Sequence, residues 1–323
     1  MEYTTLGRTG LRVSVAGLGC GGFSRLGLGT GKSEADAVAL IREALDMGVN
    51  LLDTAAAYGT EAVVGAAIKG TARDEVMITT KAAIHRGDEK LSAETVVASL
   101  DRSLRELGTD HVDAFLLHGV PPGMYEHAAQ TVAPALLREK EKGKLRHLGI
   151  TETAPNDPAH VMLGQALDDD IWDVAMVAFH MMHQNARASV FPRTVRQGVG
   201  TLMMFAVRNI FSRPERLAET MRELAAAGEV PANVAVDRPL DFLIHPGGAS
   251  SLTDAAYRYV RHEPGADVVL FGTGDREHLR TNVASILRPA LPEADRKTLA
   301  DLFGRLVGVG LDRPAHATPS PAV

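Results

Sequence analysis

The chain has 323 residues, of which 45% are hydrophobic and 23% are charged, and its formal net charge is −6 at pH 7. This composition is that of a globular enzyme, and the acidic balance gives no electrostatic reason to expect nucleic acid or an anionic membrane as a partner. No apolar run approaches the ~20 residues that span a bilayer, the N-terminus lacks a signal-peptide pattern, and Cys20 is the only cysteine, so we expect a cytoplasmic protein.

The first predicted element is a β-hairpin, because a turn signal at Arg8-Thr9-Gly10 lies between two short extended stretches within residues 3–15. From there on, apolar runs alternate with segments whose apolar residues recur at three and four positions. The eight runs are residues 15–21, 49–53, 76–81, 111–118, 145–150, 171–179, 200–206 and 267–272. Such alternation requires parallel strands with crossover helices. An open doubly wound sheet is the competitor, but eight units over about 300 residues favour an α/β fold of the (β/α)8 TIM barrel type.

Two of the intervening helices can be predicted together with their ends. Ser33 and Asp36 form a capping-box pattern, and Gly48 is well placed to follow that helix in a left-handed conformation. Ser92 can cap the third helix, and Gly108 ends it.

The segment 207–250, after the seventh strand, is longer than an ordinary connection. We predict that it is an insertion over the barrel mouth that contains a helix over residues 214–227. The domain organisation that follows is one barrel domain, residues 1–310, and a disordered, proline-rich C-terminal tail, residues 311–323.

Four ionisable side chains stand at or just past the ends of three consecutive predicted strands. Asp53 ends the second strand and Tyr58 follows in the next loop, while Lys81 ends the third strand and His118 the fourth. Active sites of such barrels lie at the carboxyl ends of the strands, so these side chains should meet at one mouth. A strand-terminal Asp is more often a helix cap, and a lone Lys is usually solvated. All four side chains together, in this order on three consecutive strand–helix units, are much harder to explain by structural roles alone.

These residue types suit general-acid catalysis on a carbonyl group. A free tyrosine has a pKa of about 10 and donates its proton slowly at neutral pH. We expect the ammonium of Lys81 to lower the pKa of Tyr58, and Asp53 to keep Lys81 charged. His118 would align the carbonyl oxygen. No side chain supplies a hydride, so a nicotinamide cofactor is expected to do so.

Six stretches occur in a characteristic order between about residues 4 and 290: GRTGLRVS, LLDTAAAYG, ITTK, VDAFLLHG, GKLRHLGIT and LFGTGDREHLRTN. They resemble the successive signatures of the aldo-keto reductase family. The resemblance implies a (β/α)8 barrel without a Rossmann domain, and a nicotinamide cofactor lying across its mouth. It also implies a catalytic tetrad of Asp53, Tyr58, Lys81 and His118. The implied activity is the reduction of aldehydes or ketones to alcohols, with NADPH as the hydride donor and NADH as the alternative.

The resemblance also implies positions that contact the nicotinamide, and several of them depart from the family pattern. Thr151 and Glu152 stand where the family usually has Ser and Asn. Met176 stands where the family usually has a Gln, and its side chain cannot hydrogen-bond the carboxamide properly. Met204, with Phe205 next to it, replaces a stacking aromatic residue. The glycines around Gly21 would let the first strand end close to the cofactor and the substrate.

The adenosine end of the cofactor is expected at the start of the last barrel helix. Thr273 and the helix N-terminus can bind a phosphate. Gly272 and His278 occupy the positions where many family members clamp the 2′-phosphate, and Asn282 suits the adenine. Arg276 and Arg280 lie nearby as substitutes, whereas Asp275 would repel a phosphate. The remaining candidate for this end is Gly274.

The candidate substrate-pocket residues are Phe23, Met124, Phe179 and His180, and their apolar character suggests a hydrophobic carbonyl substrate. His180 and His183 lack a third ligand, so we expect no metal. One alternative function is a nicotinamide-cofactor-sensing regulatory or channel-associated subunit with weak catalysis. Another is a barrel lyase or isomerase without redox chemistry. The sequence leaves the physiological substrate and the oligomeric state open.

Overall fold

The computed structural model describes residues 1–231, 234 and 237–311, and its centre is a closed barrel of parallel strands in the order β10-β11-β12-β3-β4-β5-β8-β9. The barrel strands are β3 (Ala16–Gly19), β4 (Leu51–Asp53), β5 (Met77–Ala82), β8 (Val112–Val120), β9 (Leu145–Glu152), β10 (Val174–Ala178), β11 (Gly200–Met204) and β12 (Val268–Phe271). Each falls within, or overlaps, one of the eight apolar runs. The predicted (β/α)8 barrel is confirmed.

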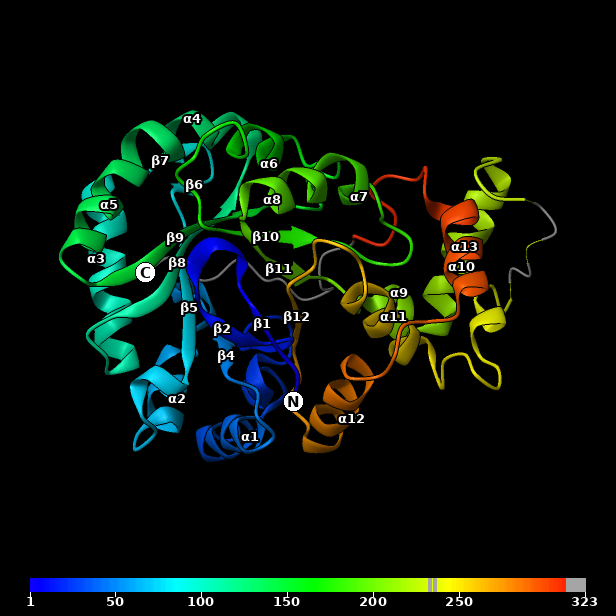
Figure 1. Ribbon diagram of the computed structural model, residues 1–323, viewed down its shortest axis with the longest axis horizontal. Helices are drawn as coiled ribbons and strands as arrows, with labels where there is room; N and C mark the ends of the chain where they lie inside the picture. Colours follow the sequence, from blue (N-terminus) through cyan, green and yellow to red (C-terminus); the bar gives the residue numbers. More distant parts are fainter. Residues whose placement is uncertain (232–233, 235–236, 312–323) are drawn as a thin grey trace.

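Helices cover the outside of this barrel (Figure 1). Apart from α10 (Pro214–Ala226), which is described below, the longer helices of the chain are α1 (Glu34–Asp46), α2 (Glu61–Ile68), α3 (Ala93–Leu107), α5 (Ala133–Glu141), α6 (Val161–Ala166), α8 (Phe191–Gln197), α11 (Leu252–Arg261), α12 (Arg276–Ile286) and α13 (Glu293–Phe303). Two short helices, α4 (Tyr125–His127) and α7 (Ala186–Ser189), and a two-stranded ribbon of β6 (His85–Arg86) and β7 (Glu89–Lys90) lie in the connections. Among the described residues, none of the helices combines the length and the apolar character that crossing a bilayer requires.

Local sequence signals set the helix ends as predicted. The Ser33 side chain accepts the N–H of Asp36, and the Asp36 carboxylate accepts the N–H of Ser33, so the capping box of α1 is complete. Ser92 caps α3 through the N–H of Thr95, and Gly108 ends that helix with a left-handed φ of 65°. These residues fix where α1 begins and where α3 begins and ends.

The N-terminal hairpin closes the bottom of the barrel. It consists of β1 (Tyr3–Thr5) and β2 (Arg12–Ser14), which pair antiparallel. Leu6 in its turn is fully buried among side chains that fill the barrel interior, including Leu51, Leu116 and Leu202. A Cβ on Gly7 would lie 2.2 Å from the backbone nitrogen of Gly200, so only glycine permits this approach.

The predicted insertion after the seventh strand is present and contains α9 (Asn209–Ser212) and α10 (Pro214–Ala226). In Figure 1, α10 lies with α13 at the far right, away from β4 and β5, so only the first part of the insertion lies near the barrel mouth. The predicted disordered tail lies outside the described residues except for Leu311, which is buried against Ala154 and Ala178.

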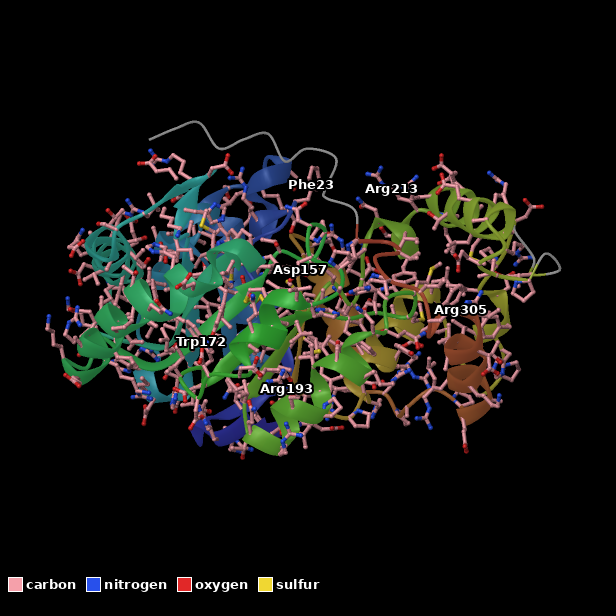
Figure 2. The ribbon with its side chains drawn as sticks, turned by 90° about the horizontal axis from the view of Figure 1, so that it is seen from above. Phe23, Asp157, Trp172, Arg193, Arg213 and Arg305 are labelled. Atoms are coloured by element: carbon pink, nitrogen blue, oxygen red, sulfur yellow. The ribbon has the colours of Figure 1, made fainter. Side chains whose placement is uncertain are left out.

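The two ends of the barrel face opposite directions. Phe23 follows β3 at its carboxyl end, whereas Trp172 precedes β10 at its amino end, and Figure 2 shows Phe23 at the upper edge with Trp172 well below it. The carboxyl ends of the strands therefore open on the side of Phe23, which is where the candidate site lies.

Leu6→Ala is expected to lower the free energy of unfolding by about 3 kcal/mol, because it removes a fully buried side chain from the barrel interior and leaves a cavity. Urea-induced unfolding followed by circular dichroism would measure the change. Val195→Ala on α8 is the control, since Val195 is 65% exposed and its loss should cost less than about 0.5 kcal/mol. Equal effects of the two substitutions would show that the hairpin does not support the barrel.

Candidate active site

The core of the candidate site is a buried ion pair between two adjacent strands. Asp53 is the last residue of β4, and Lys81 lies near the end of β5, its neighbour in the barrel. The Lys81 Nζ lies 2.7 and 2.8 Å from the two carboxylate oxygens of Asp53 and donates to the carbonyl oxygen of Thr54 at 2.8 Å. Thr79 donates a further hydrogen bond to Asp53 at 2.6 Å. The ammonium is thus held in place although it is fully buried.

Tyr58 lies directly beside this pair, in the short loop that follows β4. Lys81 Nζ is 5.1 Å from the centroid of the Tyr58 ring. A left-handed Gly59 follows the tyrosine, and a hydrogen bond between the hydroxyls of Thr54 and Thr60 closes the loop. Gly21 packs against the ring, and a Cβ there would lie 2.5 Å from the nearest ring carbon. The absence of a side chain at Gly21 therefore lets Tyr58 take its position.

His118 completes the group from β8. Its Nε2 lies 3.4 Å from the Tyr58 hydroxyl, and the two rings meet edge to face with centroids 5.5 Å apart. The structure thus brings together all four side chains that the sequence placed at the barrel mouth.

Burial and charge fix the protonation states in this group. Burial is the largest single effect on Lys81 and alone would lower its pKa, but the charge of Asp53, the interaction with Tyr58 and the hydrogen bonds to both together outweigh it and leave the pKa raised, so Lys81 stays charged. Burial, aided by the charge of Lys81, lowers the pKa of His118 to about 3, so the imidazole is neutral near pH 7.

The same effects act on Tyr58 in opposite directions. Burial raises the pKa of its hydroxyl above the ordinary value, and the charge of Lys81 offsets only part of this rise. Lys81 therefore lowers the pKa of Tyr58 as expected, but the net shift is upward, because the sequence does not reveal how deeply the phenol is buried. Tyr58 holds its proton at neutral pH, as a proton donor must.

A cavity of about 400 Å³ opens above Tyr58. This volume is in the range of small-molecule and cofactor sites. Its lining includes the predicted residues Gly21, Phe23, Met176, Met204, Phe205 and Gly272. The cavity therefore combines an apolar wall, the glycine-rich ends of β3 and β12, and the proton-bearing phenol.

Two residues that are predicted to contact the nicotinamide form hydrogen bonds within the protein. The hydroxyl of Thr151 accepts the N–H of Gly119 at 2.6 Å. One carboxylate oxygen of Glu152 accepts the N–H of Ala178 at 2.7 Å, and the other lies 2.7 Å from the Nδ1 of His160. Both side chains are buried and join β9 to its neighbours, neither is part of the cavity lining, and their contact with a nicotinamide stays a prediction.

The predicted adenosine-end residues gather at the start of α12. The hydroxyl of Thr273 accepts the N–H of Asp275. Gly274 packs closely on Gly27, so that a Cβ on Gly274 would lie 2.4 Å from the Cα of Gly27. Arg276 forms an ion pair with Glu43 of α1. His278 donates its backbone N–H to Asp275, and Asn282 is buried on the same helix.

The four predicted substrate-pocket residues separate in space. Phe23 is 55% exposed and lines the cavity. Met124 is half-buried in the turn after β8 and is not part of the cavity lining. Phe179 is fully buried and stacks on Tyr259, and His180 is fully buried beside Phe211, so the structure does not bring either of them to the cavity.

Sequence reasoning missed the polar rim of the cavity. Arg208, Asn209 and Ser212 line it from the beginning of the insertion. The Arg208 guanidinium lies 4.1 Å from the centroid of the Phe205 ring, whose backbone has a left-handed φ of 70°. The available signal was a polar Arg-Asn pair just after an apolar strand, at the end that carries the site.

Comparison with known proteins gives the same family that the sequence motifs resemble. The profile of the aldo/keto reductase family matches residues 17–302. L-Galactose dehydrogenase of Arabidopsis thaliana is 31% identical over 208 residues, which is 62% of this chain and 64% of the plant protein. Aldo-keto reductase YhdN of Bacillus subtilis is 25% identical over 301 residues, with 84% of this chain and 85% of the relative covered.

A similar fold is found among solved structures. The holo form of aldo-keto reductase AKR11C1 from Bacillus halodurans superposes with a TM-score of 0.69 at 22% identity, covering 94% of this chain and 96% of the other. At this identity, the likeness concerns the fold.

Gly21→Ala is expected to lower kcat/KM for carbonyl reduction by about 100-fold, because the added Cβ would displace the Tyr58 ring. Steady-state kinetics on an aldehyde would measure the loss, with circular dichroism to verify folding. Gly164→Ala on α6 is the matched control, since a Cβ there meets nothing within 4 Å. Unchanged turnover in Gly21→Ala would show that the position of the phenol does not depend on Gly21.

Proposed function

Because the chain belongs to the aldo/keto reductase family, we propose that it reduces aldehydes or ketones to alcohols by hydride transfer from a reduced nicotinamide dinucleotide, with Tyr58 as the general acid. The observation that carries the proposal is the phenol of Tyr58, which faces a cavity of ligand size and lies beside the buried Lys81–Asp53 pair.

The residues around the cavity fit such a cofactor. Met176 and Met204 offer polarisable apolar surface for the face of a flat ring. Arg208 and Asn209 at the rim can hold a diphosphate through charge-assisted hydrogen bonds. When bound, the nicotinamide supplies the hydride that no side chain can provide.

The chain's own residues supply the proton and the charge stabilisation. Tyr58 donates its hydroxyl proton to the carbonyl oxygen, and the fixed ammonium of Lys81 stabilises the phenolate that remains. Neutral His118 hydrogen-bonds at the same point and orients the oxygen. One hydride on carbon and one proton on oxygen complete the alcohol.

The residues that line the cavity also indicate a class of substrate. Phe23, Met204 and Phe205 present apolar surface near Tyr58, which favours a carbonyl compound with an apolar group. The family resemblance gives NADPH as the expected donor and NADH as the alternative. The regulatory-subunit alternative has no structural observation of its own in its favour.

Tyr58→Phe is expected to reduce kcat/KM by about 1,000-fold, because it removes the donated proton and retains the ring. Steady-state kinetics would give the loss, and titration with the reduced cofactor should show that binding persists. Tyr3→Phe is the matched control, since Tyr3 bonds to the Gly48 carbonyl in the hairpin region. Full turnover by Tyr58→Phe would exclude the proposed mechanism.

The pH profile of reduction should be flat between about pH 6 and pH 9. His118 is already neutral throughout this range because its pKa is about 3. Reduction needs protonated Tyr58, whose pKa is raised by burial, so activity should be lost only as the pH rises through that raised value. Alcohol oxidation, which needs the phenolate, should instead increase with pH. A fall in reduction with a midpoint near the ordinary histidine pKa would contradict these assignments.

A further inference from the structure

The loop after β12 joins the cavity to the start of α12. Phe271 and Gly272 line the cavity, and α12 begins at Arg276. In α/β barrels, phosphate groups commonly bind at the loops after the seventh and eighth strands and at a helix N-terminus. The adenosine half of a dinucleotide that leaves the cavity past Gly272 would therefore meet the charged groups around Asp275.

Asp275 occupies the N-terminus of α12 with its own carboxylate. Its Oδ1 accepts the N–H groups of Glu277 at 2.8 Å and His278 at 3.0 Å, which are donors that a phosphate would otherwise use. The bond from His278 is the main cause that lowers the pKa of Asp275, so the group is ionised at neutral pH. Both bonds go to Oδ1, which leaves Oδ2 able to accept a ribose hydroxyl.

The arginines that could clamp a 2′-phosphate are turned toward α1. Arg276 Nε lies 3.1 Å from one carboxylate oxygen of Glu43, and Arg280 Nη2 lies 2.7 Å from the other. Glu43 is only 16% exposed, whereas the two arginine side chains are more than half exposed. The carboxylate is thus the fixed member of this cluster. Figure 1 shows α1 and α12 as neighbours at the lower side of the barrel.

The remaining nearby cation is also engaged. Lys32 Nζ donates to the Gly274 carbonyl at 2.6 Å and lies 3.8 Å from Asp275 Oδ2. All three cations discussed at this end are therefore paired with a carboxylate, Lys32 with Asp275 and both arginines with Glu43.

We propose that Asp275 and Glu43 determine cofactor specificity and make this chain prefer NADH to NADPH, in contrast to the NADPH that the family resemblance alone implies. This inference rests on the proposed function. The 2′-phosphate of NADPH carries a charge of about −2 and would meet the Asp275 carboxylate. It would also have to take a guanidinium from Glu43. Exposed ion pairs are weak, so the arginines can exchange partners, and the expected discrimination is moderate, about tenfold.

Calorimetric titration of the full chain tests the preference without turnover. NADH should bind about tenfold more tightly than NADPH. The fragments 5′-ADP and 2′,5′-ADP report on the adenosine end alone, and 5′-ADP should bind more tightly. Because the discrimination is electrostatic, it should shrink as the salt concentration rises. Binding of NADPH as tight as that of NADH, or tighter, would overturn the proposal.

Two substitutions then assign the effect to the two carboxylates. Glu43→Gln releases both arginines, and Asp275→Ser removes the charge while keeping a good N-cap residue. Each should tighten NADPH binding by about fivefold to tenfold and change NADH binding by less than about threefold. The matched control is Asp301→Asn on α13, which removes an exposed carboxylate paired with Lys297 and should change neither affinity. Equal shifts for both cofactors in Glu43→Gln and Asp275→Ser would refute their assigned role.

The outcomes separate this inference from the proposed function. If wild-type protein binds NADPH more tightly than NADH, the reductase assignment stands and the specificity assignment fails. If it binds neither dinucleotide nor either fragment, the proposed function fails and the inference fails with it.

Discussion

The site depends on a positive charge that is kept inside the protein. Lys81 is fully buried, and an isolated ammonium there would lose its proton rather than remain charged. Asp53 prevents this by contacting the ammonium with both carboxylate oxygens, while the Thr54 carbonyl and the Thr79 hydroxyl satisfy the remaining polar groups. Such a pair contributes little net stability in general, but it provides a fixed charge next to Tyr58 that needs no reorganisation during a reaction.

The barrel makes this arrangement possible. Adjacent parallel strands place Asp53, Lys81 and His118 at the same end of the barrel, because the carboxyl ends of all eight strands face the same way. The contribution of the loops is different. Gly21 leaves space for the Tyr58 ring, and the insertion after β11 brings Arg208 to the rim of the cavity. The strands thus hold the ionisable groups, and the loops shape the space that they face.

Much of this was readable from the sequence because the signals are local. Ser33, Ser92 and Gly108 mark helix ends through contacts within a few residues, and strand-terminal positions follow from the alternation of apolar runs. What could not be predicted depends on contacts between distant segments. Glu152 turns to Ala178 and His160, Phe179 stacks on Tyr259 outside the cavity, and Glu43 meets Arg276 and Arg280 from the other end of the chain. The net rise in the pKa of Tyr58 could not be predicted either, because the depth of burial depends on tertiary structure.

Substitutions in the hairpin at the amino ends of the strands should affect the stability of the protein rather than its activity. Leu6 and Gly7 contact the barrel at the end opposite to Tyr58, and neither residue lines the cavity. Substitutions there act on the folding equilibrium, and in a cell a loss of one or two kcal/mol changes how much protein survives quality control. Substitutions in the hairpin would thus lower the amount of folded protein, and the molecules that fold would retain their turnover.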